Sequence, residues 1–171
     1  AEGSRIAPLG EEMPVSTEQV LHPERAFGEP RDQPVSLAFA ADPPPDWTVV
    51  HSDGLGELET RIWLQEHLGD RELAVSAATG WDGDVYRLLD GPQGEVLVWV
   101  SAWDSERDAS EFERSARAAQ TARYSEGSER ATDIVRYSQS DLPLVVLVDR
   151  PTELEGALVE PLRAVSVSPA Q

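Results

Sequence analysis

The sequence predicts an α+β fold, in which helices pack against a mainly antiparallel sheet of about four strands and an extended Pro-rich arm precedes the domain. Two observations lead to this prediction. Two pairs of apolar, strand-like segments are each joined by a short polar turn, which is typical of antiparallel hairpins. Segments with apolar residues at helical spacing precede, separate and follow these pairs. The expected order of elements is ααββαββα.

Residues 1–46 are rich in Pro, Gly and acidic side chains and include a run of three prolines. This composition predicts an extended arm. Within it, Ser16 and Gln19 have the spacing of a helix start, but Pro23 limits any helix to one or two turns. Residues 35–39 suit a short strand. The arm is therefore expected to contain little regular structure.

Residues 47–171 are expected to form the α+β domain, and its first segment, residues 47–51, suits a strand. A first helix is predicted over residues 55–68, where apolar side chains recur near helical spacing until Gly69 stops the pattern. Asp70 can cap a second helix, which ends before the next glycine. Two helices thus precede the first clear hairpin.

The first hairpin is predicted from residues 84–89 and 95–103, which flank a turn rich in glycine. Its second strand is a continuous apolar run, and such strands are central and covered on both faces. Ser105 and Asp108 then have the spacing of a capping box. They predict a helix whose apolar stripe continues to about Tyr124.

Two further strands are predicted at residues 134–137 and 142–148, the second again a continuous apolar run. Thr152 and Glu155 form another capping pair, which predicts a final helix. Pro161 should end or kink this helix, because proline cannot donate the backbone hydrogen bond that a helix interior needs. The domain is therefore expected to close with a helix on the sheet.

The charge of the chain limits its partners. The sequence has 32 acidic residues against 14 basic ones, all arginine, and its formal net charge is −18. Such a charge repels phosphate backbones and anionic membranes, so nucleic acid is not expected as a partner. Membrane insertion is not expected either, because no apolar stretch is long enough for a membrane helix. Acidic helix residues such as Glu57 are expected to be solvated surface. Adaptation to high salt is one explanation of this acidity, because salt screens the repulsion.

The sequence contains no complete catalytic motif. It has no cysteine and three histidines, none of which begins an H-E-x-x-H pattern: His22, His51 and His67. A Gly-x-Ser-x-Gly elbow is also absent. The glycine-containing segment at residues 80–83 precedes a strand, whereas phosphate loops precede a helix. We therefore predict no metal site and no cofactor, and the chain by itself is more consistent with a non-catalytic domain than with an enzyme.

Two segments combine tryptophan with carboxylates at the ends of predicted elements, and they supply the candidate ligand-binding residues: Trp81, Asp82, Asp84, Trp103 and Asp104. Such groups could bind calcium or a polar ligand. The alternative is structural, because aspartates in turns bond to backbone groups and cap helices, and tryptophans at strand ends pack in the core. A small-ligand pocket between the sheet and a helix could also be lined by Trp81, Trp99 or Trp103.

Four segments carry a resemblance to a known group of proteins: STEQVLHPER (residues 16–25), GLGEL (54–58), GWDGDVY (80–86) and WDSERDA (103–109). Over residues 14–124 the chain resembles the C-terminal half of poorly characterised secreted or lipoprotein-type proteins. In those proteins a zinc-metallopeptidase-like segment precedes this region. The resemblance implies an accessory region packed on a peptidase-like core. Its H-E-x-x-H helix would lie upstream of Ala1, with Glu18 and His22 the positions nearest to it.

Three functions follow as expectations. The first is a non-catalytic accessory or interaction domain of an exported acidic protein, which contacts a partner domain or a cell-surface ligand. The second is the C-terminal part of a zinc-dependent hydrolase whose metal-binding segment lies outside this chain. The third is a small-ligand-binding module. A chain that begins at Ala1 would fit a processed precursor or a fragment. Export to the periplasm, cell surface or medium is expected, and the cytoplasm of a halophile is the alternative.

Overall fold

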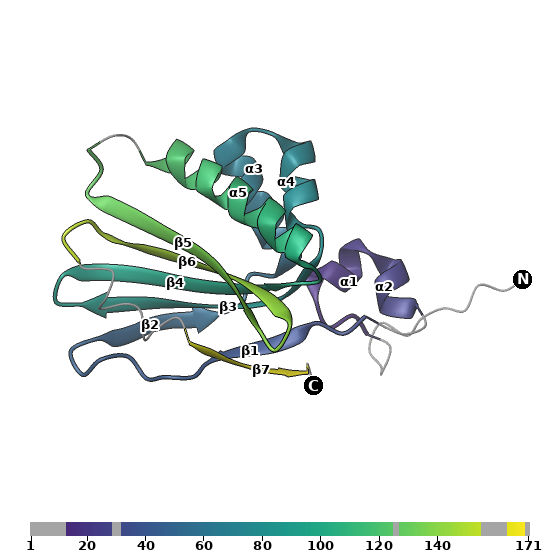
Figure 1. Cartoon of the computed structure of the whole chain (residues 1–171), viewed down its shortest axis with the longest axis horizontal. Helices are drawn as coiled ribbons and strands as arrows, with labels where there is room; N and C mark the ends of the chain where they lie inside the picture. Colours follow the sequence, from purple (N-terminus) through teal and green to yellow (C-terminus); the bar gives the residue numbers. More distant parts are fainter. Residues whose placement is uncertain (1–12, 29–31, 125–126, 155–163, 170–171) are drawn as a thin grey trace, which may run out of the picture.

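The computed structural model of the chain describes residues 13–28, 32–124, 127–154 and 164–169. It confirms the predicted α+β class, with helices packed on a mainly antiparallel sheet (Figure 1). In chain order the elements are α1 (Thr17–Leu21), α2 (Pro23–Phe27), β1 (Val35–Phe39), β2 (Thr48–Asp53), α3 (Gly56–Leu68), α4 (Arg71–Ala78), β3 (Trp81–Gly91), β4 (Gly94–Trp103), α5 (Glu106–Arg123), β5 (Arg130–Gln139), β6 (Leu142–Pro151) and β7 (Val165–Pro169).

The main sheet has five strands in the order β2-β3-β4-β6-β5, and every neighbouring pair is antiparallel. This differs from the predicted count of about four, because β2 joins the sheet as an edge strand beside β3. The strand predicted at residues 47–51 is present as β2, but all six residues of β2 are exposed, so no buried face in its sequence indicated that it joins the main sheet. The two hairpins β3-β4 and β5-β6 lie where they were predicted.

Strands β4 and β6 form the centre of the sheet, as their continuous apolar runs predicted. On β4, Trp99 and Trp103 face the helices, whereas Val98 and Val100 face the opposite side. All four side chains are at most 3% exposed. Both faces of the central strands are therefore covered, and each face belongs to its own hydrophobic cluster.

Helices α3, α4 and α5 cover one face of the sheet (Figure 1). Their predicted starts are confirmed. The backbone N–H of Leu73 donates to Asp70 Oδ1 at 3.0 Å, and that of Asp108 donates to Ser105 Oγ at 3.3 Å. Gly69 ends α3 with a φ of 66°, which glycine adopts without a steric penalty. None of the helices in the described part of the chain is both long and apolar enough to cross a membrane.

The opposite face is covered by a second, two-stranded sheet made of β1 and β7 (Figure 1). Leu37 of β1 pairs with Val167 of β7 in antiparallel register, and Leu37 joins the hydrophobic cluster beneath the main sheet. The short strand predicted at residues 35–39 is therefore present as β1, and it packs on the domain, whereas the segment was expected to form an extended arm. The reason is non-local, because the pairing partner of β1 lies at the other end of the chain.

The rest of the expected arm also contains regular structure. The predicted helix start at Ser16 is present, since Ser16 Oγ accepts from the backbone N–H of Gln19 at 3.2 Å. Pro23 ends α1 and occupies the first turn of α2. At the other terminus, Thr152 and Leu154 lie in a turn after β6. The remainder of the predicted final helix, including Glu155 and Pro161, lies outside the described residues.

Candidate functional site

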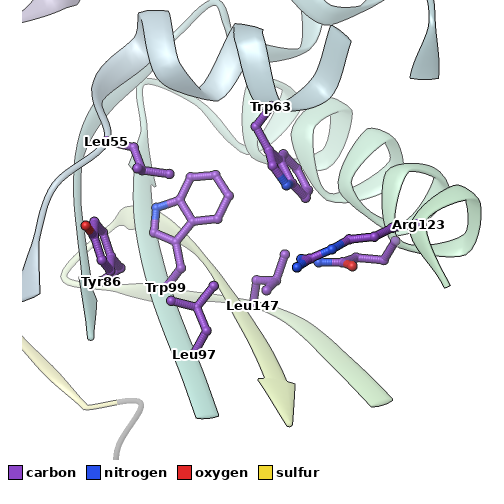
Figure 2. A pocket seen from close by; sticks show the side chains of 8 residues that line it. Leu55, Trp63, Tyr86, Leu97, Trp99, Arg123 and Leu147 are labelled. Atoms are coloured by element: carbon purple, nitrogen blue, oxygen red, sulfur yellow. The ribbon is translucent and has the colours of Figure 1, made fainter. Parts of the chain in front are cut away.

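A cavity of about 150 Å³ lies between the helix layer and the main sheet. Its walls come from α3 and α5 above and from strands β3, β4 and β6 below, and it is lined by Leu55, Trp63, Tyr86, Leu97, Trp99, Gln120, Arg123 and Leu147. In Figure 2, Trp63 points from α3 toward the cavity, opposite Leu97 and Leu147 of the sheet. The lining is mainly apolar and aromatic, as is usual for small-molecule sites.

Aromatic rings form two walls of this cavity. The rings of Trp63 and Trp99 meet edge to face, with their centroids 5.6 Å apart and their planes at 84°. Trp99 meets Phe112 of α5 in a second edge-to-face contact at 5.3 Å. The Trp99 indole is also fixed from below, because its Nε1–H donates to Asp84 Oδ2 at 2.8 Å. These contacts hold the ring in one orientation, so the wall is formed before any ligand arrives.

Gln120 and Arg123 of α5 supply the polar part of the lining. Gln120 is 6% exposed, and its amide oxygen has no hydrogen-bond partner within the described part of the chain. A buried acceptor without a donor costs free energy, so such an atom marks a place where a ligand or water could bind. Arg123 donates through Nη1 to Asp149 at 3.2 Å, and Figure 2 shows its side chain reaching toward Leu147.

The cavity adjoins a wider cleft of about 730 Å³, and the two share Tyr86, Leu97 and Arg123 as lining residues. The cleft is more polar, because it is also lined by His51, Leu88, Glu95, Tyr124, Arg130 and Asp149. Asp149 is almost fully buried and accepts hydrogen bonds from Tyr124, Arg123 and Arg130. A molecule could therefore place an apolar end in the cavity and a polar end in the cleft.

Asp84, one of the predicted site residues, holds the start of α3. Its carboxylate accepts from the backbone N–H groups of Leu55 at 2.8 Å and Gly56 at 2.9 Å, in addition to the Trp99 indole. Burial raises the pKa of Asp84, and these hydrogen bonds oppose that shift. The residue thus connects strand β3, helix α3 and the aromatic wall of the cavity.

Trp81 and Trp103, the predicted tryptophan candidates, lie outside this cavity. Trp103 is fully buried, stacks on Phe112 with centroids 4.5 Å apart and donates through Nε1 to Ser101 Oγ at 2.9 Å. Trp81 is 6% exposed and lines a separate groove of about 310 Å³ beside β1. Its indole nitrogen acts on the pKa of Asp84 as a donor, but no hydrogen bond of normal geometry joins it to a described residue.

Asp82 and Asp104, the other two candidates, come together in a carboxylate cluster at the end of the sheet. Arg25 of α2 lies at its centre and donates through Nη1 to Glu18 at 2.6 Å, to Asp104 at 2.7 Å and to Asp32 at 3.2 Å. Asp82 lies at a bulge between Trp81 and Gly83, where β3 shifts register against β4. Bulges often re-aim a side chain in this way.

The carboxyl groups of this cluster are hard to ionise together. Burial raises the pKa of Glu18 to about 8; Arg25 opposes the shift, whereas Asp104 and Asp32 add to it. Burial also raises the pKa of Asp82 to about 7, with the charges of Asp104 and Asp32 as further causes. The single positive charge of Arg25 faces several carboxyl groups and cannot balance all of them. Part of the cluster therefore stays protonated near neutral pH.

The described residues bring one group of potential metal ligands together, namely Glu18, Asp32 and Asp104, whose ligand atoms lie within 4.8 Å of one another. Arg25 already supplies positive charge there. The histidines lie in three separate places. His22 contacts Glu57 at 3.1 Å, His51 packs on Tyr86, and His67 packs on Trp63.

Glu57 departs from the expectation that acidic helix residues are solvated surface. Its side chain is fully buried beneath α1, where Oε1 accepts from Arg61 and contacts His22. Its Oε2 has no hydrogen-bond partner among the residues that the structure describes. The helical pattern of α3 did not mark this position as buried, because the segment that covers it comes from elsewhere in the chain.

Most residues that line the cavity were not predicted as site residues, although Trp99 was. One signal was present for Gln120, which follows Phe112 and Ala116 at four-residue steps and so continues the apolar stripe of α5. A polar side chain in such a stripe is expected to be buried. Trp63 and Arg123 gave no comparable signal, because their neighbours in the cavity belong to other elements.

Comparison with known proteins adds one finding. No curated protein and no solved structure matches the chain. A family model described as "Domain of unknown function (DUF8575)" matches residues 47–167, which is more than two thirds of the 171-residue chain. The matched region includes the whole main sheet, the helices that cover it and all residues that line the cavity. The chain therefore belongs to the DUF8575 family of domains of unknown function.

Proposed function

We propose that the protein is a non-catalytic module that binds a small molecule with a ring-sized apolar part in the cavity between α3, α5 and the main sheet. The observation that carries this proposal is the buried amide oxygen of Gln120, which has no partner among the described residues and belongs to a mainly apolar lining. A ligand hydroxyl or N–H group could donate to this oxygen and remove the cost of leaving it unpaired.

The size of the cavity supports a ring as the apolar part. Its volume is about 150 Å³, and a buried apolar cavity of about that volume can hold one benzene-sized molecule. The rings of Trp63 and Trp99, whose planes meet at 84°, offer aromatic contacts from two directions. A ligand with one six-membered ring and a short polar chain therefore fits the shape and the chemistry of this site.

The other two functions expected from the sequence stay predictions. Helices α1 and α3 pack against each other and carry exposed aliphatic side chains, which is consistent with an accessory domain that contacts a partner: Val20, Leu58 and Ile62. The zinc-hydrolase alternative places its metal ligands outside this chain. Small-molecule binding is preferred because it accounts for a specific cavity and for a specific unpaired atom.

The test uses 2-phenylethanol, a neutral probe with one ring and one hydroxyl group, and follows the tryptophan fluorescence of the full chain. The wild type is expected to respond in a saturable way, because Trp63 and Trp99 line the cavity. Leu97→Phe should fill the cavity and abolish the response. Val135→Phe, at a position 41% exposed on β5, is the matched control and should respond like the wild type. A flat wild-type titration, or an unchanged response in Leu97→Phe, would contradict the proposal.

A further inference from the structure

We infer that the ligand of this cavity carries an anionic group, of the carboxylate type, which binds Arg123 where the cavity meets the cleft. This inference rests on the proposed function and adds the charge of the ligand to it. The cavity takes the apolar ring, and the shared residues Tyr86, Leu97 and Arg123 lead from it into the polar cleft. An anionic substituent on a short chain would reach Arg123 while the ring stays between the tryptophans.

Arg123 has hydrogen-bonding capacity to spare. Its guanidinium carries five N–H donors, and within the described residues it donates one hydrogen bond, to Asp149 at 3.2 Å. The guanidinium also lies over the ring of Tyr124, with 4.9 Å between the carbon and the ring centroid. This contact orients the group without using its donors. The planar fork of an arginine matches the two oxygens of a carboxylate and binds them with two parallel hydrogen bonds.

The local charge also favours an anion. Asp149 is 3% exposed, and Arg130 pairs with it at 2.6 Å, closer than the 3.2 Å of Arg123. Tyr124 donates to the same carboxylate. Arg130 therefore balances the charge of Asp149 and leaves the charge of Arg123 largely uncompensated. Glu95 also lines the cleft, but its side chain is exposed and water screens its charge.

This arrangement contrasts with the rest of the molecule. The chain carries a formal charge of −18, so most of its surface repels an anion. An arginine with unused donors beside an apolar cavity instead favours the binding of an anion at this one place. A neutral ligand would gain the contacts in the cavity but would leave the Arg123 donors to water. A carboxylate gains both contributions. The site is therefore suited to an amphipathic organic anion with a single ring.

The experiment compares phenylacetate with 2-phenylethanol on the full chain by isothermal titration calorimetry at low salt. The two probes share the ring and the two-carbon chain. They differ in charge, and only 2-phenylethanol can donate to Gln120 Oε1. Phenylacetate is expected to bind at least about tenfold more tightly, because a charge-assisted pair exceeds a neutral hydrogen bond by that amount or more. Arg123→Gln should abolish the preference for phenylacetate over 2-phenylethanol. Arg107→Gln is the matched control, since that side chain is 82% exposed on the same helix.

The outcomes separate this inference from the proposed function. If both probes bind the wild type equally, the inference is overturned and the cavity proposal stands. If neither binds, both fail. Should Arg123→Gln fold poorly, the salt dependence of the wild type decides the matter. Added NaCl should weaken the binding of phenylacetate and leave the binding of 2-phenylethanol unaffected. An equal loss of affinity for both probes would contradict a direct ion pair.

Discussion

At the scale of single residues, Asp84 shows how one carboxylate can hold a helix start and an aromatic side chain together. It lies on β3, accepts from two backbone N–H groups at the start of α3 and holds the Trp99 indole. From the sequence it was a candidate for ligand binding, with a structural role as the alternative. The observed hydrogen bonds place it behind the aromatic wall, where it orients a side chain that lines the cavity.

Replacing Asp84 tests this role. Asp84→Ala leaves three donors without their acceptor and is expected to lower the free energy of unfolding by about 3 kcal/mol or more. Asp84→Asn keeps one acceptor oxygen and should lower the free energy of unfolding by less than Asp84→Ala. Urea denaturation measures both changes. Asp90→Ala, at an exposed position of the same strand, is the control and should change stability by less than about 0.5 kcal/mol. Equal stability of Asp84→Ala and this control would rule out the assigned role.

At the scale of elements, the joint between the two sheets depends on Gly83. This glycine has a φ of 150° at the bulge of β3, and a Cβ added to it would lie 2.3 Å from the backbone oxygen of Val35 on β1. Strand β1 can therefore approach β3 closely because position 83 has no side chain. The same bulge aims Asp82 toward the cluster around Arg25.

Gly83→Ala should therefore separate β1 from β3. The expected loss in the free energy of unfolding is about 1 to 3 kcal/mol beyond that of Gly69→Ala. Gly69 is a matched control, because its φ is also positive but an added Cβ would meet nothing within 4 Å. Hydrogen exchange should also become faster in β1 and β7 of the Gly83 variant. Equal losses for the two variants would show that backbone conformation, not the close approach, decides the cost.

At the scale of the whole molecule, the N-terminal helices are attached to the domain through a partly buried cluster of acidic side chains around Arg25. Arg25 of α2 joins Glu18 of α1 to Asp104 at the end of β4, which is far away in the sequence. The Glu18 side chain is 1% exposed, and its pKa is raised to about 8. The stability of this attachment should therefore depend on pH.

The direction of that dependence follows from proton binding. An unfolded glutamate ionises near its ordinary pKa of 4.5, whereas folded Glu18 keeps its proton up to about pH 8. Between these values the folded state binds more protons, so the free energy of unfolding falls as the pH rises. Glu18→Gln should make this slope less steep by at most one proton equivalent, about 1.4 kcal/mol per pH unit. Thermal unfolding from pH 4.5 to 8 measures it.

Glu66→Gln is the control for this prediction, because Glu66 is an exposed residue on α3. In Glu66→Gln the free energy of unfolding should change with pH at the same slope as in the wild type. Asp82 also has a raised pKa, so some pH dependence should remain in the Glu18 variant. A slope that is identical in the wild type and in Glu18→Gln would show that Glu18 ionises normally in the folded protein.

Much of the fold could be predicted from local patterns. The caps at Asp70 and Ser105, the stop at Gly69 and the two apolar central strands were all predicted and are present. Strand β2 was harder to place in the sheet, because all its residues are exposed. Among the candidate site residues, the sequence indicated Trp81, Trp99 and Trp103 alike as possible pocket residues. It did not distinguish Trp99, which lines the cavity, from the other two.

The sequence by itself therefore determined the class of fold, the central strands and the ends of the main helices, because capping and hydrophobic periodicity act within a few residues. Tertiary structure alone decided the pairing of β1 with β7, the burial of Glu57 and the capping of α3 by Asp84. It also decided which side chains meet around the cavity. Each of these depends on contacts between segments far apart in the sequence, which local propensity does not predict.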